Sequence, residues 1–416
     1  MKTEDISSLL NSALKFHHEG LLDQADEVYK DILKIDKKNF FANHLLGEVY
    51  QLKFKHSHDV DLINRSIKCF KESLESNPHS ADTYIKLGLS LLWLDKIDEA
   101  DKCFKQSYSV VTSEPTFLKN DLNRLNNKQA IEAMIKHEFE QLTYIDGDPD
   151  GIRNTKFSSE YYNFLKAQYK KIQEGRFESK EINHEMRLKL LKQLYNKPPK
   201  INLEHYINVK NDIAQIELDY VSSSPEIIVI DNFLSEEALE AIQKFCLSSN
   251  IFKHPYKNGY LGAFLEKGLS NQFVLKLTQN LKNTFKKIFN NLYLTEAWIY
   301  KYDSEQNGIN IHADEAKVNV NFWITPNESN LNQESGGLII WDKIPDKNWV
   351  FEDYNYIENT SKIKNMLKKN NAKKIKIPYK ENRAVIFNSQ LFHCTDKYTF
   401  KNDFINRRLN VTLLYG

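Results

Sequence analysis

Small residues recur near the start of the chain at a spacing that limits the possible folds more than any other feature. From Ala13 to Gly47 the chain advances by about 34 residues, and from Gly47 to Gly88 by about 41, which is one such step plus a short insertion. Each of the three lies in a helical pattern of apolar residues. A helical unit of this size cannot bury its apolar face alone, so neighbouring units stack into an array. We therefore predict an all-α solenoid over residues 1–112.

A second set of positions pairs a small residue with an aromatic residue four positions later. The pairs are Ala25 with Tyr29, Ser66 with Phe70, and Ala100 with Phe104. Small side chains are needed where two helices cross closely. Asn77 precedes Pro78 where a helix pair should stop, because proline disfavours helix in the residue before it. Residues 1–112 are thus predicted to form three helix pairs.

These repeats resemble the tetratricopeptide repeat, a helix–turn–helix unit of about 34 residues. The third unit carries the best match, at Tyr84, Leu87, Gly88, Ala100 and Phe104. The resemblance implies stacked helix pairs with a concave groove that binds a peptide or a partner protein. A generic array of helical hairpins is the alternative.

Residues 113–225 carry three further helical patterns, at 125–142, 158–175 and 179–195. The cluster of Gly, Asp and Pro at 145–151 predicts a turn, and Asn-Lys-Pro-Pro-Lys at 196–200 predicts a break. We expect this region to be a helical linker or an irregular extension of the repeat array.

The pattern changes at residue 226. Short runs with alternating apolar residues, separated by Gly, Pro and Asn, predict β-strands. Ser235, with acidic residues behind it, predicts the N-cap of a helix after the first strand. Many strands and few helices favour an antiparallel sandwich or barrel over residues 226–416.

The candidate catalytic motif of residues 226–416 begins at His312. Asp314 lies two positions later, so both side chains point to the same face of an extended chain. His393 follows much further along the chain, just past another predicted strand. Two histidines and one carboxylate on one face match the facial triad of non-haem iron(II) oxygenases. We predict that these three residues are the metal ligands and the catalytic centre.

Arg408 comes soon after His393, inside a further predicted strand. A guanidinium is well suited to bind a carboxylate through two hydrogen bonds. Asn410 and Thr412 follow at alternate positions, hence on the same face. This ordered set, His-x-Asp, then His, then Arg-x-Asn, resembles the signature of the iron(II)- and 2-oxoglutarate-dependent dioxygenases. The prolyl-hydroxylase-like branch is most similar.

The resemblance covers residues 226–416 and implies a double-stranded β-helix (jelly roll) with flanking helices, so the expected class is α+β and multidomain. It also implies Fe(II), 2-oxoglutarate and O2, with ascorbate as a further candidate, and Arg408 on the distal carboxylate of 2-oxoglutarate. Tyr300 or Tyr302 would line that pocket. Asn319 and Asn321 would either bind 2-oxoglutarate or satisfy a turn or sheet edge. Collagen-type members of the branch carry lysine where this chain has Arg408, so their substrate is not carried over.

The whole chain is similar to bacterial proteins that join tetratricopeptide repeats to such an oxygenase domain. We therefore expect a dioxygenase that hydroxylates a peptide or protein side chain held with help from the repeats. One alternative is a metabolite hydroxylase whose repeats serve assembly. Others are a repeat scaffold with a decayed oxygenase domain, or a cupin-type enzyme, which would not explain Arg408. The long insertion at 342–374 predicts a partly helical lid or substrate wall, with a solvated lysine-rich end.

The composition argues against several other classes of protein. Basic residues number 57 and acidic residues 56, which leaves no electrostatic footprint for nucleic acid or an anionic membrane. No apolar run reaches the roughly 18 residues of a membrane span, and the first residues do not match a secretory signal. The four cysteines form no CxxC pair, which predicts buried thiols in a reducing cytoplasm and argues against structural zinc.

Overall fold

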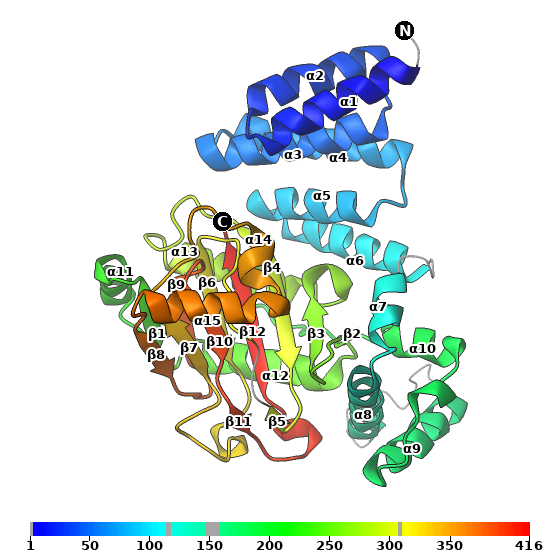
Figure 1. The fold of residues 1–416 in the computed structure, drawn as a ribbon, viewed down its shortest axis with the longest axis vertical. Helices are drawn as coiled ribbons and strands as arrows, with labels where there is room; N and C mark the ends of the chain where they lie inside the picture. The colour runs from blue at the N-terminus through cyan, green and yellow to red at the C-terminus, as the bar shows by residue number, and fades with distance from the viewer. Residues whose placement is uncertain (1–2, 114–117, 147–158, 307–309) are drawn as a thin grey trace. The chain divides into compact units, whose positions relative to one another are not determined.

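The computed structural model describes residues 3–113, 118–146, 159–306 and 310–416 (Figure 1). The chain forms two compact units. The first contains residues 1–114 with 270–275 and 291–293, and the second contains the rest. Within the described ranges, no helix has both the length and the apolar character needed to cross a bilayer.

The helices α1 to α6 form the repeats of the first unit (Figure 1). They are α1 (Thr3–His18), α2 (Leu22–Ile35), α3 (Phe40–Ser57), α4 (Val60–Ser76), α5 (Ala81–Trp93) and α6 (Ile97–Ser113). Consecutive helices pack on one another, and side chains of Asn39, Asp59 and Ser80 cap the starts of α3, α4 and α5. The predicted all-α solenoid is thereby confirmed. The insertion between Gly47 and Gly88 falls within α3 and α4, which have 18 and 17 residues.

The repeated small residues lie where helices cross. A Cβ atom on Gly47 would lie 2.6 Å from the ring of Phe70, and one on Gly88 would lie 3.1 Å from the ring of Phe104. The hydroxyl of Ser66 donates to the carbonyl of Gly47 at 2.8 Å. Close approach of the two helices is thus the physical reason for the repeat spacing.

The middle region is helical. Its helices are α7 (Lys119–Arg124), α8 (Lys128–Asp146), α9 (Ser159–Gln173), α10 (His184–Leu191) and α11 (Ile213–Ser222). The third predicted helix is shorter than expected, because Lys192 adopts an extended conformation and ends α10. Residues 196–200 contain neither helix nor strand, as predicted, whereas most of the turn predicted at 145–151 lies outside the described residues. The described part of this region clusters with the strands of the second unit.

Buried ion pairs fix α8 to the strand-rich region. The carboxylate of Glu138 is fully buried and accepts hydrogen bonds from Lys253 Nζ and Asn250 Nδ2, both at 2.7 Å. Two positions along, Glu140 pairs with the buried guanidinium of Arg407 at 2.8 Å. Arg407 also forms an ion pair with Asp303.

The second unit contains a seven-stranded antiparallel sheet. In spatial order its strands are β1 (Ile227–Ile230), β9 (Ala384–Asn388), β6 (Val318–Trp323), β12 (Leu409–Tyr415), β4 (Leu294–Lys301), β3 (Leu261–Phe264) and β2 (His254–Pro255). Two smaller sheets consist of β10 (His393–Thr395), β7 (Leu338–Trp341) and β8 (Lys374–Ile377), and of β11 (Tyr398–Thr399) and β5 (Glu305–Gln306). The flanking helices are α12 (Glu236–Ser248), α13 (Gln272–Thr284), α14 (Phe351–Asn355) and α15 (Thr360–Lys369). Ser235 caps α12, as predicted.

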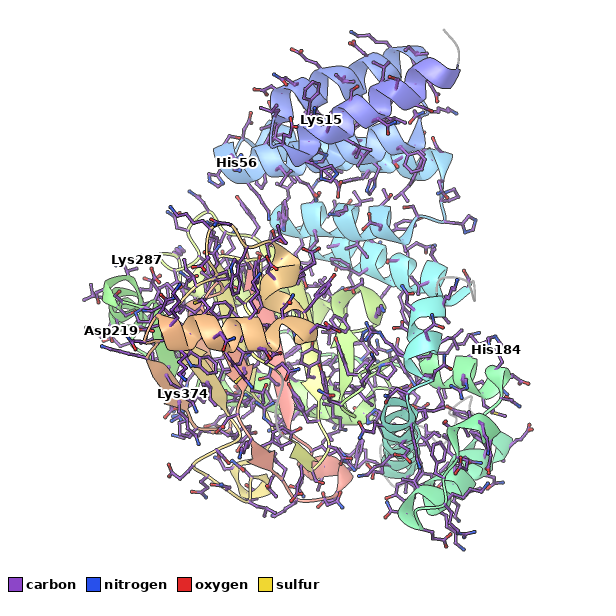
Figure 2. All side chains as sticks on the ribbon, in the orientation of Figure 1. Lys15, His56, His184, Asp219, Lys287 and Lys374 are labelled. Carbon is purple, nitrogen blue, oxygen red and sulfur yellow. The ribbon has the colours of Figure 1, made fainter. Side chains whose placement is uncertain are left out.

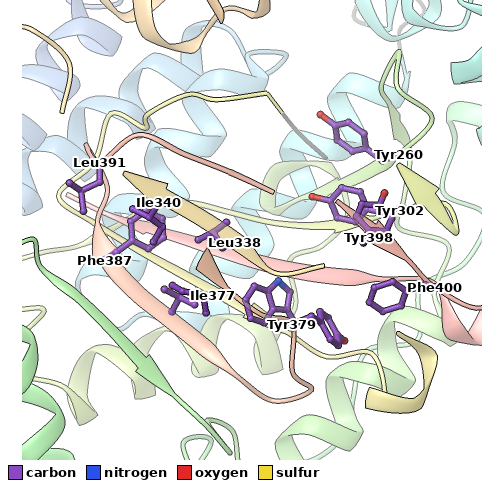
Figure 3. Packing of buried hydrophobic residues seen from close by; sticks show 12 residues of the cluster. Tyr260, Tyr302, Leu338, Ile340, Ile377, Tyr379, Phe387, Leu391, Tyr398 and Phe400 are labelled. Carbon is purple, nitrogen blue, oxygen red and sulfur yellow. The ribbon is translucent and has the colours of Figure 1, made fainter. Parts of the chain in front are cut away.

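The core of this unit lies between its two larger sheets (Figure 3). Leu338 and Ile340 of β7 and Ile377 of β8 pack against Phe387 of β9 and Trp323 of β6. The predicted antiparallel jelly roll with flanking helices is therefore confirmed. Lys374, at the lysine-rich end of the insertion, is exposed (Figure 2).

The Glu138–Lys253 pair provides a test of how the middle region is held. Lys253→Met should lower the free energy of unfolding of the second unit by about 3–5 kcal/mol, because it leaves a buried carboxylate without its cation. Denaturant unfolding followed by tryptophan fluorescence measures this, since four of the five tryptophans lie in the second unit. Lys189→Met, which removes an exposed pair with Glu185, is the control and should leave the free energy of unfolding almost unchanged, because solvent screens such a pair. Equal effects of the two substitutions would contradict the assigned role.

Candidate functional site

His312, Asp314 and His393 come together at one end of the jelly roll. The first two lie in the loop before β6, and His393 begins β10. Two backbone hydrogen bonds join the segments: the amide of His312 donates to the carbonyl of His393 at 3.0 Å, and the reverse bond measures 2.8 Å. One ligand atom from each of the three side chains lies within 4.8 Å of the other two. The structure thus assembles the predicted triad from distant parts of the sequence.

Both imidazole rings are held in the orientation that metal binding needs. Nδ1 of His312 lies 2.8 Å from the carbonyl oxygen of Asn310, and Nδ1 of His393 lies 2.9 Å from that of Leu391. A carbonyl accepts only, so each Nδ1 donates to it, and in a neutral imidazole this tautomer leaves the lone pair on Nε2. The Nε2 atoms lie 3.7 Å and 3.4 Å from the Asp314 carboxylate oxygens. Three electron-pair donors therefore face one point.

The protonation states also suit a metal. Burial opposes ionisation of Asp314, but His393, His312 and the amide of Asn319 outweigh it and lower the pKa of this carboxyl. Asn319 Nδ2 donates to Asp314 Oδ2 at 2.9 Å. Burial, and then the neighbouring His393, lower the pKa of His312. An ionised carboxylate and a neutral imidazole are the forms that bind metal.

The insertion at 342–374 packs against the backbone of the triad. Ala313 and Phe392, each adjacent to a predicted ligand, are fully buried against Ile363 and Leu367 of α15. The side chain of Asn355 donates to the carbonyl of Ala313 at 3.0 Å. The insertion is partly helical, as expected. The packing of the insertion against both ligand segments was not predicted, because no sequence pattern within the insertion indicates which part of the chain it contacts.

Arg408 lies just before β12 and is fully buried among aromatic rings. Its guanidinium carbon lies 4.7 Å from the ring centre of Tyr302, 5.6 Å from that of Tyr398 and 5.9 Å from that of Trp323. Nε donates to the carbonyl of Gly336 at 2.8 Å. Neither terminal nitrogen makes a hydrogen bond to any described residue. A buried guanidinium with two open donors fits a carboxylate that binds through two oxygens.

The other predicted cofactor residues share the face of Arg408. Asn410 pairs across the strands with Tyr300, and Thr412 pairs with Asn321, so all four side chains point into the jelly roll. The hydroxyl of Thr412 lies 3.1 Å from the amide nitrogens of both Asn321 and Asn410. The amide oxygens of these two asparagines have no partner among the described residues.

The two candidate tyrosines differ in position. The amide of Tyr302 donates to the carbonyl of Arg408, and its ring lies beside the guanidinium, whereas the hydroxyl of Tyr300 lies 3.2 Å from that of Tyr256. Tyr302 is therefore the better placed to line a pocket at Arg408. Tyr398, on β11, was missed, because only the tertiary fold brings it there.

Gly336 and Gly337, the two glycines before β7, each have a structural reason. Its φ of +85° is a left-handed conformation that favours glycine, and it directs the carbonyl to Arg408. A Cβ atom on the next residue, Gly337, would lie 2.0 Å from the backbone oxygen of Ile377. No local sequence pattern indicates that the carbonyl of this glycine supports an arginine.

The donor set fits both Fe(II) and 2-oxoglutarate. His312, Asp314 and His393 offer two imidazole nitrogens and a carboxylate, a set that suits non-haem iron. Arg408 offers two open donors in the same interior. Among described residues, a second group that could hold a metal consists of His44, Glu48 and Asp82 in the repeats, but Glu48 is already paired with Lys86 at 2.7 Å.

Metal binding is directly testable. Asp314→Ala should weaken binding of Fe(II) or Co(II) by at least about 100-fold, because it removes the charged ligand of the triad. Anaerobic titration calorimetry on the full chain measures this. Glu315→Ala removes an exposed carboxylate at the next position and should leave the affinity unchanged. A normal affinity in Asp314→Ala would show that the metal binds elsewhere.

No family model matches the chain, and no curated protein matches its sequence. Among solved structures, the MamA RS-1 ArsTM double mutant is 18% identical with a TM-score of 0.24, over 28% of this chain and 61% of that one. This chain thus spans less than two thirds of the MamA structure.

Two other matches are enzymes by name. The non-haem α-ketoglutarate-dependent epimerase SnoN from nogalamycin biosynthesis is 9% identical with a TM-score of 0.34, over 49% of this chain and 82% of that one. A Pseudomonas putida prolyl-4-hydroxylase is 12% identical with a TM-score of 0.30, over 49% and 98%. All three matches lie below 25% identity and below a TM-score of 0.5.

Proposed function

We propose that this protein is an iron(II)- and 2-oxoglutarate-dependent dioxygenase that hydroxylates a C–H bond. His312, Asp314 and His393 bind the metal, and Arg408 binds the distal carboxylate of 2-oxoglutarate. The observation that carries the proposal is the fully buried guanidinium of Arg408 with two unused terminal nitrogens. A metal triad alone also suits cupin-type chemistry, whereas this arginine requires an anion in the same interior.

One row of side chains connects the two parts of the site. Asn319, Asn321 and Trp323 occupy alternate positions of β6 and share one face. Asn319 holds Asp314 at one end of the row, and the ring of Trp323 lies 5.9 Å from the Arg408 guanidinium at the other. We propose that 2-oxoglutarate binds along this row, with Asn321, Asn410, Thr412 and Tyr302 lining its pocket.

The residues of the chain bind the cosubstrate, orient the metal ligands and keep water out of the site. When bound, the metal and 2-oxoglutarate would supply the oxidising chemistry together with O2: one oxygen atom would enter the substrate C–H bond and the other would enter succinate, with release of carbon dioxide. Arg408 binds the carboxylate where the rings of Tyr302, Tyr398 and Trp323 displace water, which strengthens the ion pair. Asn319 donates a hydrogen bond to Asp314 and thereby orients its carboxylate.

A cleft that reaches Asn310, two residues before His312, offers a place for the substrate. Its volume is about 580 Å³, and its walls include Glu132 and Lys136 of α8, Gln173 of α9, and Asp303 and Asn310. Asn310 supplies the carbonyl that orients His312. The wall is mainly polar, so we propose a polar substrate. The helices α8 and α9 would then serve the active site rather than only link two domains.

We further propose that the substrate is a peptide or protein side chain, recruited through the groove that stacked repeats provide. The alternative is a small metabolite in the same cleft, with the repeats used for assembly. A decayed, non-catalytic domain is disfavoured, because all three ligands and the arginine are in place. No nucleic acid or membrane partner is proposed, and a cytoplasmic location fits the four unpaired cysteines.

Succinate formation tests the reaction class. The full chain with Fe(II), ascorbate and 2-oxoglutarate should form succinate, and His393→Ala should abolish it. Arg408→Met should raise the 2-oxoglutarate concentration needed for half-maximal rate by about 100-fold, because a charge-assisted bidentate contact is lost. Arg408→Lys should recover part of the affinity, since it restores the charge but not the fork. Unchanged turnover in His393→Ala would overturn the assignment.

Cell extract distinguishes the substrate classes. If the substrate is a protein or peptide, extract should stimulate succinate formation, and digestion of the extract with protease, followed by inactivation of the protease, should remove the stimulation. Stimulation that survives protease and passes a small-pore filter would assign a metabolite instead. His393→Ala is the control for succinate made by other enzymes of the extract.

A further inference from the structure

A second pocket lies on the opposite side of β4 from the candidate metal site. Tyr300 and Tyr302 face the metal side, so alternation turns Lys301 to the other face. Lys301 is only 3% exposed. It lines a small cavity together with His137, Lys136, Asp303 and Arg407. Lys301, His137 and Arg407 have no role in the proposed oxygenase chemistry. Lys136 and Asp303 also line the proposed substrate cleft, and Tyr302, which lines this cavity too, belongs to the proposed 2-oxoglutarate pocket.

Lys301 is buried without a hydrogen-bonding partner. Its Nζ lies 3.5 Å from the ring centre of Phe404 and 5.6 Å from that of Phe252, and makes no hydrogen bond to a described residue. A ring face stabilises an ammonium from one side, but an ammonium has three N–H donors. Burial, and then Arg407, lower the pKa of Lys301 to about 7. The N–H groups of Lys301 that do not face a ring therefore lack a hydrogen-bond acceptor among the described residues.

His137 shares the same surroundings. It is 4% exposed, and its ring packs at 5.5 Å from that of Phe252 and 5.9 Å from that of Phe404. Neither of its ring nitrogens makes a hydrogen bond to a described residue. Two unsatisfied polar side chains therefore flank the same pair of aromatic rings.

The charges around the cavity do not balance. Lys136 donates to both carboxylate oxygens of Asp303, at 2.9 and 3.0 Å, and Arg407 pairs with Asp303 and Glu140. These two cations and two carboxylates compensate one another. Protonated Lys301 adds a further positive charge with no carboxylate of its own. A buried cation without a counter-ion is costly, so an anion would complete the cluster.

We propose that this pocket, defined by Lys301 and His137, binds one small monovalent anion of the class of chloride. The cavity has a volume of about 20 Å³, which suits a single ion or water molecule and excludes an organic ligand. Asp303 and Lys136 line both this cavity and the larger cleft. The anion would therefore stabilise the packing of α8 on β4 at the base of the proposed substrate cleft. The inference does not depend on the oxygenase assignment.

Halide titration at constant ionic strength tests the proposal. Replacing sodium gluconate by sodium chloride or bromide should raise the thermal midpoint of the full chain, with saturation. The unfolding equilibrium constant should fall about tenfold when the halide reaches roughly ten times its Kd. Lys301→Met should abolish this response. Lys286→Met, which removes an exposed lysine of the same unit, should retain it.

A crystal of the unaltered protein grown with bromide gives a second measurement that needs no variant. The expected result is an anomalous peak beside Lys301 Nζ and His137. A water molecule in the cavity with no anomalous signal would overturn the proposal, as would an equal halide response in Lys301→Met. If Lys301→Met does not fold, His137→Leu takes its place and should weaken the response.

Discussion

The candidate site depends on two reciprocal backbone hydrogen bonds between His312 and His393. They fix two segments that lie far apart in the sequence, and so set the distance between the imidazole rings. Side chains could not hold this geometry alone, because each histidine can adopt several rotamers about two bonds. The carbonyls of Asn310 and Leu391 fix the rings, and α15 packs behind both segments.

The interior of the jelly roll carries a cost that a ligand would offset. Arg408 is fully buried with two unused donors, and the amide oxygens of Asn321 and Asn410 are also unpaired among the described residues. Buried polar groups without partners destabilise a fold, so their presence in a row indicates a binding site rather than a structural core. The surrounding aromatic rings exclude water and support the guanidinium.

Strand β4 separates two different environments. Tyr300 and Tyr302 face the proposed 2-oxoglutarate pocket, while Lys301 between them faces α8. The middle helices are therefore part of the strand-rich unit and not only a linker, because Glu138 and Glu140 of α8 form buried ion pairs with the strand-rich region. Strand β4 and helix α8 thus lie between the metal side, the cleft and the proposed anion pocket.

The sequence by itself determined the repeats, the strands and the identity of the candidate ligands, because these follow from local rules. Small residues mark close helix crossings, alternation marks strands, and His-x-Asp, His and Arg keep a fixed order. Tertiary structure alone decided that Asn319 holds Asp314, that Tyr398 joins Tyr302 at Arg408, and that α15 supports the ligand loop. These contacts join segments far apart in the chain, and whether a buried side chain such as Lys301 finds a partner depends on packing that no local pattern encodes.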